Sequence, residues 1–463
     1  MFHSYISKKN DNDILKGPIL PQIMLFVLPL MFTNLLQVFY SAADMIVVGL
    51  SEVPGAIGSI GTTNALINFF VNLFSGFAVG TTVVVAKNIG ANKGKETEKA
   101  VHSSVVISLL SGIICGVLGF ILSKPILVYL GDEGGILRLA VLYTRIYFVG
   151  APFLSVANSL IAVFRAKGDT KTPLFILSLC GLLNVLLNLF FVLVCKMSVD
   201  GVAIATVISN GLSAFLLLVK LSKLDDWCRF DISRLKLDKT ESIDIIKNGI
   251  PAAIQGMCFS FSNMLIQSSI IGLNNSIIPG GSAIIDGNAA ATSVEGFLYT
   301  ACNSVYQATV TFVSQHFGAR KFKRINLVVL DSYLSTTLIA LVGTCIVILF
   351  QDTILGFYIS DPLAIDAGKT RFLINIMPYF LLAWMEVGSG VLRGLGKSMT
   401  STIISLTGSC IFRIFWISVI FPMYPSLETV YLSYPISWGL TGLIEFIFGY
   451  SERKRLIAMQ TST

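Results

Sequence analysis

The sequence predicts an all-α polytopic membrane protein whose twelve transmembrane helices form two pseudo-symmetric lobes of six. Three observations lead to this prediction: long apolar segments, a regular alternation of basic loops, and an internal repeat. Hydrophobic residues make up 54% of the 463 residues and charged residues only 13%, whereas soluble domains usually carry roughly 25% charged residues. The composition therefore excludes a soluble protein with a solvated surface on all sides.

The apolar segments have the length that a membrane requires. A helix rises about 1.5 Å per residue, so roughly 20 mostly apolar residues cross a hydrocarbon core about 30 Å thick. The segment Val101–Leu122, for example, holds no charged residue. By this criterion we expect spans at residues 20–50, 57–86, 100–122, 137–163, 173–195, 201–219, 246–272, 283–315, 326–350, 368–392, 398–421 and 429–449.

The basic residues alternate between successive connections. The N-terminal segment, with Lys8, Lys9 and Lys16, and the connections that follow every second span hold 26 of the 33 Lys and Arg residues. Basic loops are retained in the cytoplasm, so we expect an inner-membrane protein, embedded in the lipid bilayer, with both termini cytoplasmic. The net charge of +7 is therefore a topology signal, and we expect no nucleic-acid partner.

The chain resembles itself at a shift of 228 residues. The matches fall in two separate motifs and pair Thr81, Val85, Gly90, Ala91 and Lys93 with Thr309, Val313, Gly318, Ala319 and Lys321, and Arg165, Gly168 and Thr172 with Arg393, Gly396 and Thr400. We expect an N-terminal lobe at 1–220, a polar cytoplasmic linker at 221–245 and a C-terminal lobe at 246–463. Because six spans per repeat is an even number, the repeats are parallel, and transporters built from repeats bind substrate between them near mid-membrane.

With these motifs the chain resembles the multidrug and toxic compound extrusion (MATE) family. The resemblance is carried by Pro29, Tyr40, Asp44 and Gly49 in the first span, Gly80-Thr-Thr with Gly90-Ala91, Phe164–Pro173 (FRAKGDTKTP), Gly201–Val207 (GVAIATV), Gln315–Ala319 (QHFGA) and Leu392–Ser398 (LRGLGKS). It implies two six-helix lobes in a V and export of amphipathic, often cationic, compounds driven by entry of H⁺ or Na⁺. It implies no enzymatic activity and no cofactor besides the coupling ion.

Asp44 is the principal candidate for ion coupling. It lies inside the first span, where a charged side chain costs about 2.5–3.5 kcal/mol on insertion scales and requires a reason. A buried carboxyl group can exchange a proton, or bind a cation when it is ionised. The alternative is a structural acid that bonds a neighbouring helix. The resemblance favours coupling, because the family carries its coupling acid here.

Four polar residues of the same half are candidate partners of Asp44. Asn184 and Asn188 are four residues apart, so they share one helix face; Asn158 and Thr206 lie on neighbouring spans. Amide and hydroxyl oxygens suit a hard cation, and the resemblance places these positions beside Asp44. Some relatives have an acid in place of Asn188. The site of this protein would carry one negative charge rather than two, which weakens the case for Na⁺ and leaves proton coupling open. The alternative is that these side chains only bridge helices.

The C-terminal half has its own intramembrane charges. Glu295 and Glu386 are the acids, and Arg145, Arg371 and Arg413 are possible partners. Such groups usually face the bundle interior and pair, so a structural and a functional role are both open. We expect Glu445, nearer a helix end, to be solvated.

Substrate contacts should be mostly apolar and aromatic, and Met adapts to varied shapes. The candidates are Tyr40, Met257, Phe261, Tyr299, Tyr379 and Met385; ordinary helix packing is the alternative for each one. We expect no catalytic residue and no metal site, and the partners should be small amphipathic substrates bound by a monomer. The competing function is a lipid-linked oligosaccharide flippase of the same superfamily, which would need a strongly basic central cavity.

Overall fold

The computed structural model describes residues 14–51, 53, 55–129 and 134–461, and regular secondary structure in these residues is helical throughout. The first half comprises α1 (Ile19–Gly49), α2 (Ala56–Gly90), α3 (Gly94–Tyr129), α4 (Gly134–Val149), α5 (Ala151–Lys167), α6 (Lys171–Leu189), η1 (Phe190–Val194) and α7 (Val199–Ser222). A short η2 (Ile232–Arg234) lies in the connection to the second half. The second half comprises α8 (Lys239–Ile277), α9 (Ala283–Gly318), α10 (Phe322–Leu349), α11 (Gln351–Gly356), α12 (Pro362–Arg371), η3 (Phe372–Ile376), α13 (Phe380–Gly394), α14 (Ser398–Ser405), η4 (Leu406–Ile411), α15 (Phe412–Phe415), η5 (Trp416–Ile420), α16 (Phe421–Met423) and α17 (Leu427–Thr461).

Each expected span coincides with one long helix or a run of consecutive helical segments. In the described residues, eight helices are long and apolar enough to cross a membrane, or up to ten if two bent pairs each form one span. The other two, α9 and α17, are 36 and 35 residues long. They are more polar because they bury side chains such as Ser304 and Glu445 between neighbouring helices. The predicted fold class, an all-helical polytopic membrane protein, is confirmed.

The two bent spans occupy equivalent places in the repeat. α4 and α5 meet at Gly150 with a bend of 50°, and the segments on either side of Pro378 meet at 46°. Residues 150 and 378 are related by the same shift of 228 residues. Pro152 at the start of α5 and Pro378 each lack the N–H that a continuous helix would use, which explains why both spans break here.

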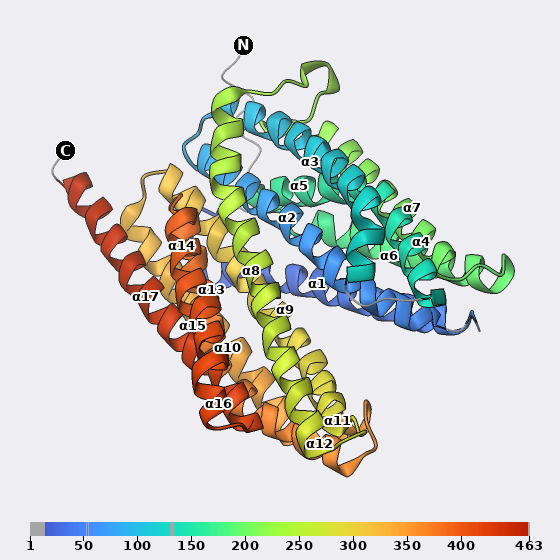
Figure 1. Ribbon diagram of the computed structural model, residues 1–463. Coiled ribbons are helices and arrows are strands. Elements are labelled where there is room, and N and C mark those ends of the chain that lie inside the picture. The colour runs from blue at the N-terminus through green and yellow to red at the C-terminus, as the bar shows by residue number, and fades with distance from the viewer. Residues whose placement is uncertain (1–13, 52, 54, 130–133, 462–463) are drawn as a thin grey trace.

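The two halves form bundles that meet along α2 and α8 and diverge at their other ends (Figure 1). A reciprocal pair of glycines marks the close contact between them. A Cβ on Gly90 would lie 2.0 Å from the carbonyl oxygen of Gln315, and a Cβ on Gly318 would lie 2.0 Å from that of Lys87. Because 90 pairs with 318 and 87 with 315 at the shift of 228, this contact follows a pseudo-two-fold relation between the halves.

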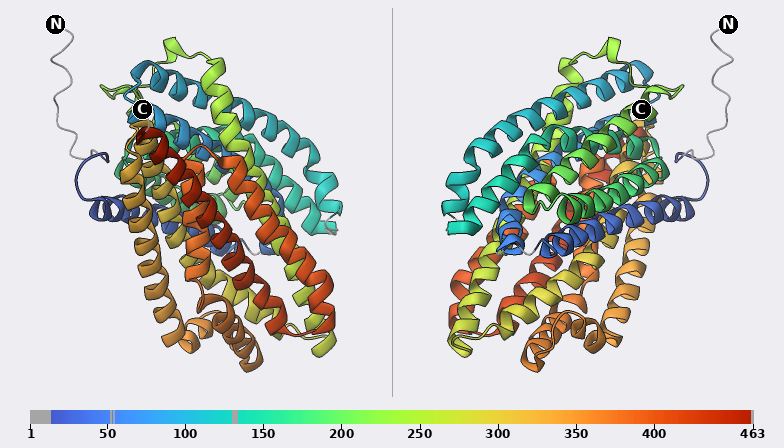
Figure 2. Two further views of the ribbon diagram at one scale, coloured as in Figure 1. Left: turned by 90° about the vertical axis from the view of Figure 1, so that its left-hand side faces the viewer. Right: turned by 90° about the vertical axis from the view of Figure 1, so that its right-hand side faces the viewer.

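The first helix of each half crosses into the core of the other half. Ile23 and Phe26 of α1 pack with Phe312 of α9 and Val328 of α10, and the two opposite views of Figure 2 show α1 extending along the lower side of the first half to the helices of the second half. Conversely, Ile245 near the start of α8 belongs to the core of the first half. The lobes are thus joined by two exchanged helix ends.

The connection between the halves is shorter than the expected linker. α8 begins at Lys239 because the Asp238 carboxylate accepts hydrogen bonds from the backbone N–H groups of Thr240 and Glu241, a helix N-cap. The hydrogen-bonded Lys99 ammonium, together with these backbone contacts, holds the pKa of Asp238 below its usual range. Arg234 forms an ion pair with Glu98 at 2.9 Å, so the connection packs on the start of α3.

The basic connections gather at one end of the molecule. Lys321 donates to the carbonyl oxygen of Leu15, and Gln460 donates to that of Arg320, so both ends of the described chain meet the turn between α9 and α10. Lys8 and Lys9, which contributed to the topology prediction, lie outside the described residues. The same end of the molecule holds the close contact between the two halves.

Candidate functional site

A chain of polar side chains runs through the first half, from Asp44 to Thr206. On α6, the amide of Asn188 donates to the Asp44 carboxylate of α1 and, at 3.2 Å, to Asn184 Oδ1. The amide of Asn184 in turn donates to Thr206 Oγ1 of α7 at 3.4 Å. The structure therefore brings together four of the five residues expected at the ion site, from three different helices.

One oxygen atom in this row of polar side chains has no hydrogen-bond partner in the described residues. Asn188 is fully buried, and its Oδ1 atom is hydrogen-bonded to nothing in the described part of the chain. A buried acceptor without a partner costs about 1–3 kcal/mol, so this oxygen is available to a cation or a water. Asp44, by contrast, is only partly buried. The arrangement offers a carboxylate, amide oxygens and a hydroxyl oxygen, which are the ligands that hard cations prefer.

Close packing of α1 on α6 holds Asp44 in place. The Tyr40 hydroxyl donates to the carbonyl oxygen of Ser178 at 3.2 Å, and its ring lies so near Gly181 that a Cβ there would fall 1.8 Å from Cε2. Tyr40 is thus a packing contact beside the polar chain. One turn beyond Asp44, Val47 and Val48 enter an apolar cluster with Tyr143 and Val202, which closes the site on that side.

A cavity of about 330 Å³ lies between the halves. Its wall includes two arginines at equivalent positions of the repeat, Arg165 and Arg393, and the acid Glu386. Arg393 donates to Gln255 Oε1 at 2.7 Å and to the Tyr306 hydroxyl. Both arginines belong to the repeated motifs of the sequence and lie in the last turns of α5 and α13, from which their side chains reach the cavity. Other polar side chains of the wall are Asn72, Thr82, Asn158, Tyr299, Asn303, Gln307 and Ser389.

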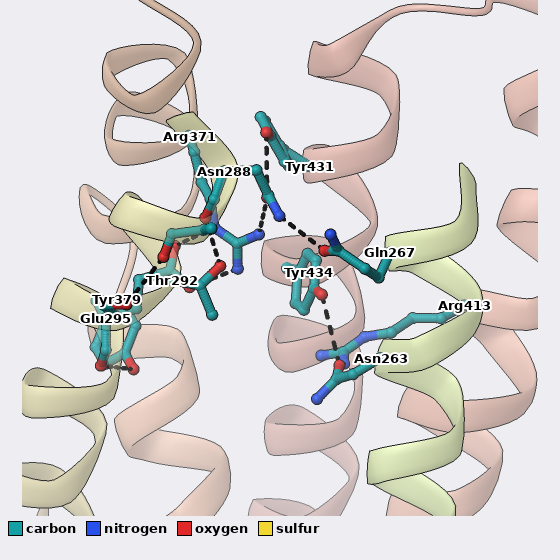
Figure 3. Close-up of polar contacts among 12 residues, drawn as sticks. Asn263, Gln267, Asn288, Thr292, Glu295, Arg371, Tyr379, Arg413, Tyr431 and Tyr434 are labelled. Carbon is teal, nitrogen blue, oxygen red and sulfur yellow. Dashed lines mark hydrogen bonds and ion pairs between the residues drawn. The ribbon is translucent and has the colours of Figure 1, made fainter. Parts of the chain in front are cut away.

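The acid–arginine pair of the second half is Glu295 with Arg371. Two parallel hydrogen bonds join them, Nε to Oε1 at 2.8 Å and Nη2 to Oε2 at 2.7 Å. Arg371 also donates to Asn288, whose amide donates to Gln267 Oε1 at 2.8 Å (Figure 3). Such bidentate pairs are strong and geometrically specific, so the charge of Glu295 is neutralised and fixed.

Arg413 lies beside this pair, and no acid of the described residues forms an ion pair with it. Its Nε donates to Ser437 at 2.8 Å and its Nη1 to Asn263 at 3.4 Å. The guanidinium lies 4.4 Å from the ring centre of Tyr434 and 5.9 Å from that of Trp438. In Figure 3, Arg413, Asn263 and Tyr434 form one group next to the group that contains Arg371, Asn288 and Glu295.

The remaining candidates fall in different places. Asn158 lines the central cavity rather than joining the Asp44 chain. Tyr299 also lines the cavity. Tyr379 and Met385 are 2% exposed and pack in the core of the second half. The side chains outside the cavity wall are Met257, which is partly buried, Phe261, which is 53% exposed, and Arg145, which stacks on Phe120 at 5.0 Å.

The expectation that Glu445 is solvated is wrong. Its side chain is fully buried and accepts hydrogen bonds from Ser401 and Ser405 of α14. A signal for this exists in the sequence: Ser433, Ser437, Thr441 and Glu445 recur every four residues, which places them along one face of α17. All four are fully buried, so this polar stripe faces the bundle and not water.

Comparisons with known proteins identify the family. A family model described as MatE matches residues 29–190 and 251–417, together more than half of the chain. The multidrug export protein MepA of Staphylococcus aureus is 24% identical over 95% of this chain and 96% of its own length. The probable multidrug resistance protein YoeA of Bacillus subtilis is 26% identical over 73% of this chain and 72% of its own length.

A solved structure of a multidrug resistance MATE family transporter, described as outward-facing, has the same fold. Its TM-score is 0.89 at 19% identity, over 97% of this chain and 99% of that one. The chain therefore belongs to the multidrug and toxic compound extrusion (MATE) family, whose members are multi-pass membrane transporters and not enzymes.

Proposed function

We propose that the protein is a cation-coupled antiporter, which exports amphipathic compounds in exchange for H⁺ or Na⁺ that binds at Asp44. The observation that carries this proposal is the chain from Asp44 through Asn188 and Asn184 to Thr206, with the unpartnered oxygen of Asn188 at its centre. An acid bonded to neutral amides can change its charge without breaking an ion pair.

The conformation supports a coupling scheme. The halves are closed at the end where the basic connections gather, and the central cavity lies between them. If these connections are cytoplasmic, this is a state open to the outside, in which Asp44 receives its ion and substrate leaves. A coupling ion drives the cycle only if it binds the two states with different affinity.

The test is transport by the purified full-length chain in proteoliposomes, with H⁺ and Na⁺ gradients imposed separately. Asp44→Asn keeps the size of the side chain and an acceptor for Asn188, but removes the exchangeable charge. We expect gradient-driven dye export to fall to the rate measured without a gradient. Asp331→Asn is the matched control, because Asp331 is a partly buried acid on α10, outside the Asp44 chain, and it should export normally.

Unchanged export by Asp44→Asn would remove the coupling role. The flippase alternative gives a different result, because such a protein would move a lipid-linked sugar and would show no dye export under either gradient. A gradient that drives export by the wild type but not by Asp44→Asn would therefore establish both the reaction class and the coupling residue.

A further inference from the structure

Two buried arginines of the second half, Arg371 and Arg413, lie close together but differ in their counter-charge. The guanidinium of Arg371 is neutralised by the bidentate carboxylate of Glu295. Arg413, which is 5% exposed, makes no ion pair with any acid in the described residues. Charged side chains within a membrane usually pair with one another. This lobe also buries two acids outside the ion pairs, Glu386 and Glu445, but their hydrogen-bond partners are neutral side chains other than Arg413. The guanidinium of Arg413 therefore has no counter-charge next to it among the residues that the structure describes.

The neutral neighbours of Arg413 offset only part of the free energy that is lost when its charge is buried. The hydroxyl of Ser437 and the amide oxygen of Asn263 accept from Nε and Nη1, and the rings of Tyr434 and Trp438 flank the cation. A cation–π contact is worth about 0.5–2 kcal/mol, less than the cost of an unpaired buried charge. Within the described part of the chain, Nη2 has no hydrogen-bond partner and remains available to an anion.

One member of this group of residues lies at the surface of the protein. Asn263 is exposed although its Oδ1 lies within hydrogen-bond distance of both Arg413 and the Tyr434 hydroxyl. The amide nitrogen of Asn263 therefore adds a donor at an accessible entrance. We name Arg413, Asn263, Tyr434 and Ser437 the Arg413 cluster.

A stripe on α8 connects the cluster with the central cavity. Gln255, Phe259, Asn263 and Gln267 follow one another at intervals of four residues, so each lies next to the following one on the helix surface. Gln255 and Phe259 line the cavity, and Asn263 belongs to the cluster. A ligand of moderate length that occupies the cavity can therefore place one end at Arg413.

The cavity has the same sign of charge as the cluster. Its wall holds Arg165 and Arg393 but a single acid, Glu386. The Nε atoms of both arginines are buried without a hydrogen-bond partner in the described residues. The path from the cavity to the cluster is thus lined by more guanidinium groups than carboxylates, which attracts anions.

We propose that the Arg413 cluster binds the acidic group of the exported compound, a carboxylate, sulfonate or phosphate ester, while the apolar body of the compound lies in the central cavity. Arginine presents donors in a fork that matches such oxyanions, and Asn263 supplies the further donor. The proposal rests on the exporter function proposed above and specifies its substrate class. It differs from the mainly cationic substrates that the family resemblance implies.

The test uses two dyes of one skeleton and opposite charge. Binding of the anionic 5-carboxyfluorescein and the cationic rhodamine 123 to the purified full-length chain in detergent is measured by fluorescence anisotropy. Arg413→Gln should weaken carboxyfluorescein binding by about tenfold or more, the value of one charge-assisted contact, and leave rhodamine binding within about twofold. Arg145→Gln is the matched control, because Arg145 lies on α4 in the other half, and it should bind both dyes as the wild type does.

A second variant keeps the test valid if Arg413→Gln folds poorly. Asn263→Asp, at an exposed position, places a carboxylate of the protein beside Arg413 and fills the site internally. Its midpoint of thermal unfolding should not fall, yet carboxyfluorescein binding should be lost to the same extent. The proposal is overturned if a folded variant of either kind binds carboxyfluorescein like the wild type, or if both dyes weaken equally.

These measurements are independent of the coupling test. Binding at equilibrium requires no gradient, so Asp44→Asn should bind carboxyfluorescein normally even though it does not export. If Arg413→Gln binds carboxyfluorescein like the wild type while the wild type still exports dye under a gradient, the Arg413 proposal alone is rejected. If Arg413→Gln loses carboxyfluorescein binding selectively but the wild type shows no gradient-driven export, the antiporter proposal alone is rejected.

Discussion

The two halves share a backbone plan but treat their buried acids differently. In the first half, Asp44 contacts the amide of Asn188, and no cation is paired with it in the described residues. In the second half, Glu295 is held by two charge-assisted bonds to Arg371. The first acid can gain or lose a charge with little rearrangement, whereas the second cannot be neutralised without leaving an unpaired guanidinium.

This difference separates two tasks within one repeated architecture. A coupling site has to change its occupancy during the cycle, and an acid bonded to neutral groups allows this. A fixed ion pair cannot take part in the same way, but it holds α9 and α12 together beside Arg413. The fixed pair is thus a feature of the second half without a counterpart at Asp44, although the second half also holds Glu445, which in the described residues accepts only from hydroxyl groups.

The largest expected effect comes from breaking the fixed pair. Glu295→Gln should lower the free energy of unfolding by about 3–5 kcal/mol, because it leaves Arg371 buried without a counter-charge. The double variant Glu295→Gln/Arg371→Met removes both charges and should recover part of this loss. Thermal unfolding in detergent measures both. Asp44→Asn, which breaks no ion pair, should stay near the wild type, and an equal loss in Asp44→Asn would contradict the comparison.

A smaller effect tests what the halves have in common. Alanine at Gly90 or at Gly318 would place a Cβ 2.0 Å from a carbonyl oxygen of the other half. Overpacking of this kind costs about 1–3 kcal/mol. Both variants should therefore destabilise, by equal amounts, the conformation in which the two halves touch at this contact. The population should then shift away from the state described above.

Spin labels on the diverging ends report this shift. Val194 and Phe357 are exposed, one in each half, and labels attached there in a variant without the eight native cysteines should approach each other when the closed contact opens. Gly296→Ala is the matched control, because a Cβ there meets nothing within 4 Å. A response to only one of the two glycine variants would show that the pseudo-two-fold relation does not govern the motion.

The sequence predicted the fold well because its signals are local or repeated. Hydropathy locates spans without knowledge of their neighbours, and the shift of 228 residues paired Gly90 with Gly318, whose reciprocal contact between the halves the structure then revealed. Spacing placed Asn184 and Asn188 on one helix face, which a single chain reveals through its periodicity. That this face lies beside Asp44 came from the family resemblance and not from spacing.

The errors concern positions whose surroundings are supplied by other helices. Glu445 is buried because Ser401 and Ser405 of a separate helix solvate its carboxyl group, and its place near a helix end gave no indication of this. Tyr379 and Met385 have the composition of a binding surface, yet neighbouring helices enclose them. An apolar residue in a span can face lipid, core or cavity, and its identity alone does not distinguish the three.

The smallest expected effect concerns the charge of the Asp44 site itself. Asn188→Asp replaces the fully buried amide donor with a second carboxylate beside Asp44, so that the oxygens of Asn184 and Thr206 surround two acids. Calcium sites gain affinity with the number of charged ligands, and we expect the same trend for Na⁺, with about tenfold tighter binding, or about 1.4 kcal/mol. Export driven by a Na⁺ gradient should then saturate at lower Na⁺, and the double variant Asp44→Asn/Asn188→Asp, with one acid again, should lose this gain. If the Na⁺ dependence of Asn188→Asp equals that of the wild type, the polar chain joins helices and takes no part in selecting the coupling ion.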